Sequence, residues 1–179
     1  MRYVKLCTAL FFTLMIGSCS SEQSLQEYFV SNAENPNFIS FDVPASLLNL
    51  EKVELTQDQK EAVSSLKKLN VLAFTKNDAN MAEFEAEKQK VKAILKNAAY
   101  SELMTMNTSF GKATIQVKGD DDTLDELIIY GNNTDKGFVL IRVLGDNMNP
   151  ASLMQAIQAM QNSDMNIDGL TQLGNLFKG

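Results

Sequence analysis

The feature that most constrains the fold of this 179-residue chain is a run of four strand-like segments in its second half. Short stretches rich in Gly, Asp and Asn separate them, and such stretches form tight turns. The segments cover residues 102–107, 113–118, 124–130 and 138–144. Because turns this short join neighbouring antiparallel strands, we expect an antiparallel meander.

The segment 113–118 shows how this sheet should face its surroundings. Apolar and polar side chains alternate along it, in the order Ala113, Thr114, Ile115, Gln116, Val117 and Lys118. Alternation with a period of two is typical of a strand with one buried and one wet face. We therefore expect helices to pack on one face of the sheet.

Three helices are predicted from their start signals and apolar spacing. Ser24 with Glu27 and Thr56 with Gln59 form capping-box patterns, and Asn80 with Glu83 forms a similar pair. The expected buried stripes are Leu25, Tyr28 and Phe29 in the first helix; Ala62, Val63, Leu66 and Leu69 in the second; and Met81, Phe84, Lys88, Val91, Leu95 and Ala98 in the third, which covers residues 80–99.

The remaining segments complete the expected order of elements. Residues 38–43 predict a strand that Pro44 closes, residues 45–50 a helical turn, and residues 70–75 a buried strand. Pro150 follows Asn149 as the first residue of a helix whose stripe is Leu153, Ile157 and Met160. A last amphipathic segment carries Ile167, Leu170, Leu173 and Phe177. The predicted fold is a single α+β domain over residues 24–179, with a mostly antiparallel (mixed) sheet of five to six strands.

The N-terminus has the organisation of an export signal. Arg2 and Lys5 precede an apolar stretch, residues 6–16, interrupted only by Thr8 and Thr13. A helix that spans a bilayer needs about 20 apolar residues, so this 11-residue stretch is too short for a permanent membrane anchor.

The end of this stretch, Ile16-Gly17-Ser18-Cys19, resembles the processing site of bacterial lipoprotein precursors. The resemblance implies that residues 1–18 are a signal peptide and that Cys19 receives a diacylglyceryl group and an amino-terminal acyl chain, typically palmitate. Residues 19–23 then form a short tether. The domain is expected in the cell envelope, outside the cytoplasm, on the inner or the outer membrane. The alternative is a plain secretory signal that leaves Cys19 as a free or intermolecularly bonded thiol.

Charge and composition exclude several functions. Without Arg2 and Lys5 the chain keeps 14 of its 16 basic residues against 22 acidic ones, which gives a formal charge of −8. Nucleic-acid binding depends on Lys and Arg contacts to phosphates and is disfavoured. The chain contains no histidine, which removes imidazole metal sites and histidine-dependent triads. No cofactor is predicted, and the methionines at positions 104, 106, 154, 160 and 165 are expected in the core.

Two acidic stretches are the remaining candidate sites. Asp164, Asn166 and Asp168 with Gly169 reproduce the first half of a calcium loop, although Asn175 occupies the position of the bidentate glutamate. In the second stretch Asp121, Asp125 and Glu126 are candidates for a carboxylate-dependent hydrolase, and a plain β-turn explains the same residues. Thr123 lies in an Asp-Thr-Leu sequence that resembles a Bacteroidota O-glycosylation sequon.

Three further stretches resemble the Bacteroidota family of domain of unknown function 4252. They are residues 99–104 (Ala-Tyr-Ser-Glu-Leu-Met), 124–129 (Leu-Asp-Glu-Leu-Ile-Ile) and 138–146 (Phe-Val-Leu-Ile-Arg-Val-Leu-Gly-Asp), with residues 46–50 as a helical turn after the first strand. The similar part covers about residues 24–160, which leaves 161–179 as a helical extension. The resemblance implies an envelope-associated α+β domain and transfers no catalytic residue.

Two classes of function are consistent with these observations. The first is a tethered, non-enzymatic binding or scaffolding module with an envelope protein as its partner. The second is a carboxylate-dependent hydrolase or a calcium-binding envelope protein. An enzyme requires the candidate carboxylates to converge in a pocket, so the structure can separate the two.

The lipid attachment is tested by the substitution Cys19→Ser. Because no other residue of the mature chain carries a thiol, we expect the variant to be released from the membrane or to stay unprocessed, while its domain still folds. Membrane fractionation with immunoblotting measures attachment and processing, and circular dichroism measures folding. A variant that is processed and remains in the membrane fraction contradicts the prediction.

Overall fold

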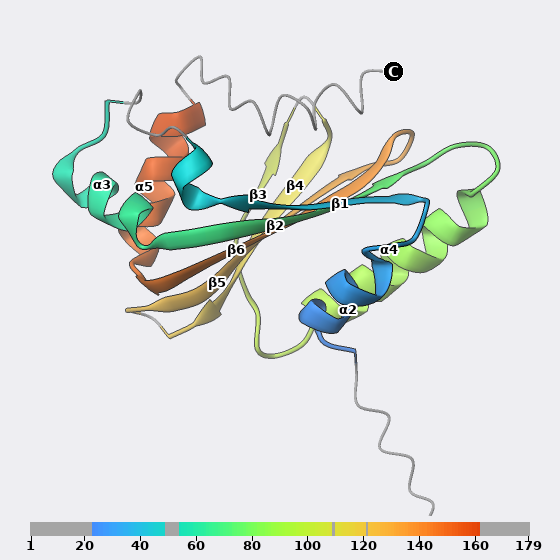
Figure 1. The fold of residues 1–179 in the computed structure, drawn as a ribbon, viewed down its shortest axis with the longest axis horizontal. Coiled ribbons are helices and arrows are strands. Elements are labelled where there is room, and N and C mark those ends of the chain that lie inside the picture. Colours follow the sequence, from blue (N-terminus) through green and yellow to red (C-terminus); the bar gives the residue numbers. More distant parts are fainter. Residues whose placement is uncertain (1–22, 49–53, 109, 121, 162–179) are drawn as a thin grey trace, which may run out of the picture.

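The computed structural model describes residues 23–48, 54–108, 110–120 and 122–161. Within these ranges the chain forms one six-stranded sheet in the order β1-β2-β6-β5-β4-β3 (Figure 1). The strands are β1 (Phe38–Pro44), β2 (Leu66–Thr75), β3 (Ser101–Asn107), β4 (Lys112–Gly119), β5 (Leu124–Asn133) and β6 (Gly137–Met148). The predicted α+β class is confirmed.

Every pair of neighbouring strands in the sheet is antiparallel, and β3 to β6 form the predicted meander. The first two strands join this meander through β2, which pairs with β6 over most of its length. Gly137 opens β6 with a φ of 128°, and a Cβ atom there would collide with the backbone oxygen of Phe74. The turn before β6 therefore needs glycine at this position.

Four α-helices and one 3-10 turn accompany the sheet in the described ranges. They are α2 (Leu25–Asn32), η1 (Ala45–Leu48), α3 (Gln57–Ser64), α4 (Met81–Leu95) and α5 (Pro150–Gln161). Both capping boxes are confirmed: Ser24 caps α2 together with Glu27, and Thr56 caps α3 together with Gln59. These caps bind backbone N–H groups that the first helical turn leaves without partners.

The helices cover both faces of the sheet, whereas the sequence predicts them on one face. On one face α2 and α4 enclose an aromatic core that includes Tyr28, Phe38, Phe74, Phe84 and Phe138. On the other face Leu153 of α5 and Val63 of α3 join Leu69, Ile115 and Val143 of the strands. The reason is that β2 and β5 bury side chains on both sides, so neither face tolerates full exposure to water. Figure 1 shows α2 beside α4, and α3 beside α5 at the opposite end of the sheet.

The boundary between α3 and β2 differs from the prediction. Leu66 and Leu69, expected on a helical stripe with Ala62, belong to β2, because α3 ends at Ser64. The hydroxyl of Ser65 donates to the carbonyl of Ala62, and the carbonyl of Ser65 accepts from the N–H of Asp146 in β6. Pairing with β6 thus extends the strand four residues upstream of the predicted start at residue 70.

The longest helix is also shorter than predicted. It runs from Met81 to Leu95 rather than to residue 99, and a turn closed by Asn97 follows, in which Tyr100 N–H donates to the Asn97 carbonyl. Phe84, Val91 and Leu95 are buried as expected, but Met81 is half exposed. Lys88 places its ammonium 5.0 Å from the centre of the Phe84 ring, so its stem covers apolar surface.

Other predicted elements are confirmed in part. The alternation along β4 is correct, with Ala113, Ile115 and Val117 buried, and Leu153 is buried under α5. The side chains of Ile157 and Met160 and all of residues 162–179 lie outside the described part of the chain. Among the described helices none combines the length and apolarity that crossing a bilayer requires.

The aromatic core allows a stability test with a matched control. Phe138 is fully buried and stacks on Phe74 at 5.6 Å between ring centres, whereas Val30 of α2 is 71% exposed. We expect Phe138→Ala to lower the free energy of unfolding by about 3–5 kcal/mol, because it leaves a cavity. Val30→Ala should change it by no more than about 0.5 kcal/mol. Denaturant titration of both variants measures the difference, and equal effects would contradict the packing described.

Candidate functional site

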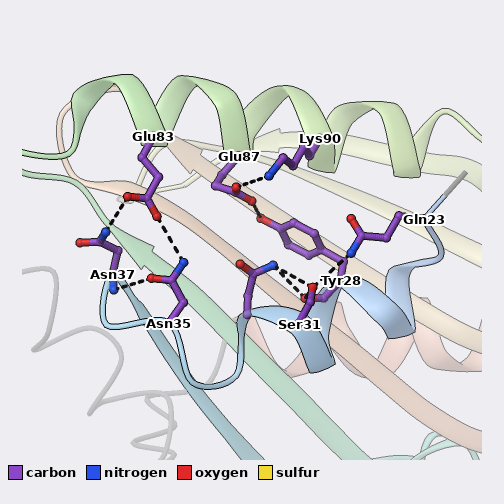
Figure 2. Close-up of polar contacts among 9 residues, drawn as sticks. Gln23, Tyr28, Ser31, Asn35, Asn37, Glu83, Glu87 and Lys90 are labelled. Carbon is purple, nitrogen blue, oxygen red and sulfur yellow. Dashed lines mark hydrogen bonds and ion pairs between the residues drawn. The ribbon is translucent and has the colours of Figure 1, made fainter.

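A buried hydrogen bond fastens α2 to α4. The hydroxyl of Tyr28 donates to the carboxylate of Glu87 at 2.8 Å, and both residues are buried. Lys90, one turn further along α4, pairs with the other carboxylate oxygen of Glu87 at 2.6 Å (Figure 2). Burial, followed by the hydrogen bond to Glu87, raises the pKa of Tyr28 well above its ordinary value. Tyr28 is therefore a permanent donor at this contact.

A second polar contact holds the loop after α2 against the start of α4. Glu83 accepts from Asn35 at 3.2 Å and from Asn37 at 2.7 Å (Figure 2). Asn80 does not cap α4 through its side chain, contrary to the expected pair with Glu83. Instead its amide donates to the Thr75 carbonyl and to the Asn37 side chain. Together these contacts fix α2 relative to the sheet.

On the face that carries α2 and α4, the side chains change from aromatic to polar along the strands. The row of paired positions 38, 74 and 138 is aromatic, and the row two residues further contains Leu72, Leu140 and Tyr130. The next row crosses all six strands and is polar in five of them. We call this row the polar ladder: Asp42, Asn70, Arg142, Ile128, Gln116 and Glu102.

Arg142 is the central residue of the polar ladder. Its guanidinium donates two hydrogen bonds to Glu126, at 3.0 and 2.6 Å, in the fork geometry that arginine forms with carboxylates. The side chains of both residues are about nine-tenths buried. The hydrogen bonds to Glu126 raise the pKa of Arg142, and burial opposes this effect. Lys118 lies 3.8 Å from the same carboxylate, an ion-pair distance longer than a hydrogen bond.

Two hollows flank α2 on this face. The first, of about 380 Å³, lies between α2 and the edge strand β1, and we call it the α2 groove. Its lining residues are Gln26, Phe29, Val30, Ala33, Ser40, Phe41, Asp42, Lys68, Asn70 and Arg142. It combines an apolar wall from α2 with a charged floor, in which Lys68 pairs with Asp42 at 3.4 Å.

The second hollow, of about 350 Å³, lies where α2 begins and α4 ends, and we call it the N-terminal pocket. Leu25, Ala93, Ile94 and Tyr100 give it apolar walls, and Lys90 and Lys118 also line it. Both hollows fall within the size range of ligand pockets in proteins.

The predicted carboxylate cluster does not form a converging site. Asp120, Asp122 and Asp125 are exposed, whereas Glu126 is buried in its pair with Arg142, and Asp121 lies outside the described residues. In the described ranges no three acidic or cysteine side chains gather closely enough to hold a metal ion. Thr123 is exposed in the turn before β5, and its glycosylation stays a prediction.

Other predicted site residues fall outside the part of the chain that the structure describes. These are the processing and lipidation residues Ile16, Gly17, Ser18 and Cys19, and the calcium candidates Asp164, Asn166 and Asp168. The structure therefore tests neither prediction.

Sequence reasoning missed the pair of Glu126 and Arg142, although a signal for it exists. Each residue interrupts an otherwise apolar strand at a position where the alternation predicts burial, Glu126 in Leu-Asp-Glu-Leu-Ile-Ile and Arg142 in Val-Leu-Ile-Arg-Val-Leu. Charges at such positions are rarely buried unless they are paired, so two of them in adjacent strands indicate a partner for each other.

Comparison with protein-family models gives one match, described as Domain of unknown function (DUF4252), which covers residues 28–156. The matched region begins inside α2 and ends inside α5, so it includes the whole sheet. Comparisons with curated proteins and with solved structures give no match.

The contact between α2 and α4 predicts opposite results for two Tyr→Phe substitutions. Tyr28→Phe removes the donor to one oxygen of the buried Glu87 carboxylate, while Lys90 still pairs with the other oxygen, and we expect the free energy of unfolding to fall by about 1.5–3 kcal/mol. Tyr130 is also buried, but its hydroxyl has no hydrogen-bond partner in the structure. Tyr130→Phe should therefore be neutral or slightly stabilising. Denaturant titration separates the two cases, and equal losses would show that the Glu87 contact is not responsible.

The tyrosines also predict a loss of stability at alkaline pH. Burial is the first cause that raises the pKa of Tyr28, of Tyr100, and of Tyr130, the last to about 12. In the unfolded chain they ionise near pH 10, so the unfolded state binds fewer protons above that pH and stability falls as pH rises. We expect the tyrosinate absorbance of the folded, signal-free chain to rise at a higher pH than that of the unfolded chain, and to rise together with unfolding. Titration of all tyrosines near pH 10 in the folded chain would contradict this.

Proposed function

Because the chain belongs to the family of domain of unknown function DUF4252, which assigns no activity, we propose from its own residues that it is a lipid-anchored cell-envelope protein acting as a non-enzymatic binding module. The membrane attachment rests on the order of charge, apolar stretch and Ile16-Gly17-Ser18-Cys19 at the N-terminus. The binding role rests on the surface beside α2.

One observation carries the choice of binding surface: the α2 groove is lined in part by an edge strand of the sheet. Strand β1 is the first in the strand order, so it pairs with β2 on one side only. The groove is lined by three consecutive β1 residues, Ser40, Phe41 and Asp42, whose side chains point alternately to the two faces. The hollow therefore adjoins the strand whose outer side is unpaired among the described residues.

An extended polypeptide segment fits this geometry. A partner strand can add to an unpaired edge through main-chain hydrogen bonds, and pockets beside the edge then select its side chains. Phe29 and Val30 offer an apolar wall, and Val30 is 71% exposed. Asp42 and Lys68 offer one charge of each sign at the groove floor. We infer that the partner is an envelope protein with an extended segment that carries apolar and charged side chains.

Two of the residues proposed for a hydrolase, Asp125 and Glu126, are not arranged for catalysis. Glu126 accepts both hydrogen bonds from Arg142, so its carboxylate is occupied, and Asp125 is exposed to solvent beside it. General acid–base catalysis needs such groups directed at one substrate position. The described carboxylates of this turn do not meet that requirement.

Site-specific photocrosslinking in living cells tests the proposal. A photoreactive amino acid replaces Ser40 on β1, or Val30 on α2, and mass spectrometry identifies the products. The matched control replaces Thr105, which is also exposed on an edge strand, but on β3 at the opposite edge. We expect one reproducible protein adduct from positions 40 and 30 and none from position 105. No adduct from the first two positions, or an identical pattern from all three, would contradict the proposed surface.

A further inference from the structure

The N-terminal pocket brings together segments that are far apart in the sequence. Gln23, Ser24 and Leu25 come from the start of α2, Lys90 and Ile94 from α4, Tyr100 from the approach to β3, and Lys118 from β4. Leu25 is buried, and Ile94 is largely buried, so the walls are rigid parts of the core. The pocket is thus built from four elements whose relative positions the fold fixes.

The two amines in this pocket retain hydrogen-bonding capacity. Lys90 pairs with Glu87 at 2.6 Å, which accounts for one of the three N–H donors of its ammonium group. Lys118 is 3.8 Å from Glu126 and makes an ion pair without a hydrogen bond. Both side chains are about half exposed, and they approach the pocket from different elements. Because both lysines line the pocket, an oxygen anion bound there can accept from the N–H donors that these pairs leave over.

The position of the pocket in the chain determines which anions it meets. Gln23, one of its lining residues, follows Cys19 by four residues, and four extended residues span at most about 14 Å. If Cys19 carries the lipid, as the proposed function states, this pocket is the part of the described structure that the tether holds nearest to the bilayer. The phosphates of the lipid headgroups are then the anions at highest local concentration.

We propose that the N-terminal pocket binds the phosphate of a membrane phospholipid between Lys90 and Lys118, and thereby sets the orientation of the domain on its bilayer. This inference rests on the lipid attachment in the proposed function. Leu25, Ile94 and Tyr100 contact the glycerol and upper acyl region, while the amines bind the headgroup. The α2 groove lies on the other side of α2, so it remains accessible to a protein partner.

The overall acidic charge of the domain does not oppose this contact. Long-range repulsion from other acidic residues is screened over about 8 Å at physiological ionic strength, whereas the two amines act at contact distance. A zwitterionic headgroup also adds no net charge to the surface. The amines of Lys90 and Lys118 therefore determine whether a headgroup binds. The net charge of the domain disfavours only strongly anionic membranes.

Headgroup quenching on the full lipidated protein tests the proposal. In the proposed lipidated protein the diacylglyceryl group occupies the thiol of Cys19, so a single introduced cysteine can be labelled selectively: Ala93→Cys at the pocket or Lys60→Cys on α3, on the opposite face of the sheet. The protein is reconstituted in phosphatidylcholine vesicles that contain a headgroup-linked quencher. We expect quenching of a fluorescent label at position 93 to exceed that at position 60 several-fold. Equal quenching at the two positions would overturn the proposed orientation.

Charge variants separate pocket binding from simple proximity. Lys90→Gln with Lys118→Gln should lower the quenching at position 93 to the level of position 60. The matched control, Lys92→Gln with Lys96→Gln, removes the same charge from exposed positions of α4 and its C-terminal cap outside the pocket, and should leave the quenching unchanged. An unchanged signal in the first pair, or an equal loss in both pairs, would overturn the proposal.

Two measurements identify other causes of failure. Flotation of the same vesicles reports whether the protein is attached to lipid, so a failed attachment contradicts the proposed function, whereas attached protein with unselective quenching contradicts only the orientation. Inorganic phosphate is added to the detergent-solubilised protein labelled at position 93. A Lys90- and Lys118-dependent fluorescence change at low millimolar phosphate would assign the pocket to a soluble phosphate ligand and overturn the membrane assignment.

Discussion

The pairing of β2 with β6 is the contact on which the rest of the structure depends. It joins strands that are separated along the chain by α4 and three other strands, and it places Phe74 directly opposite Phe138. Their rings stack at 5.6 Å, and Phe38, Phe84 and Tyr130 surround them. Without this pairing the meander and the β1–β2 pair would each bury only part of their apolar surface. Bringing such distant segments together costs conformational entropy. The burial and stacking of the aromatic core offset this cost.

The sequence predicted elements better than it predicted their limits. The strands of the meander and both capping boxes depend on local patterns, and all are present in the structure. The start of β2 depends on a distant interaction, because the backbone of Ser65 accepts from Asp146. Ala62, Leu66 and Leu69 also fit helical spacing, so periodicity alone could not separate the end of α3 from the start of β2. That helices cover both faces of the sheet could likewise be predicted only with knowledge of which strands lie at its centre.

The polar contacts of the candidate site were harder to predict for the same reason. Tyr28 and Glu87 are 59 positions apart, and Glu83 bonds to Asn35 and Asn37 rather than to its expected partner Asn80. A capping pair is a local pattern, but Asn80 is buried and finds the Thr75 carbonyl nearer. The polar ladder arises only when six strands take their register, since its members are scattered from Asp42 to Arg142. The aspartates before β5 suggested a hydrolase because they are close together in the sequence. The charged pair in the structure, Glu126 and Arg142, is close in space but not in sequence.

The capping box at Ser24 has a mechanical consequence. The helix it starts is the first described element after the N-terminal segment, and Tyr28 joins that helix to α4 within its first turn. A pull on the upstream chain therefore acts on the Ser24–Glu27 cap and then, through Glu87, on a helix packed along the sheet (Figure 1). Ser24 is followed directly by α2, so a load that reaches Ser24 passes to the helix without an intervening segment. Tension at Ser24 is therefore transmitted through α2 and the Tyr28–Glu87 hydrogen bond to α4.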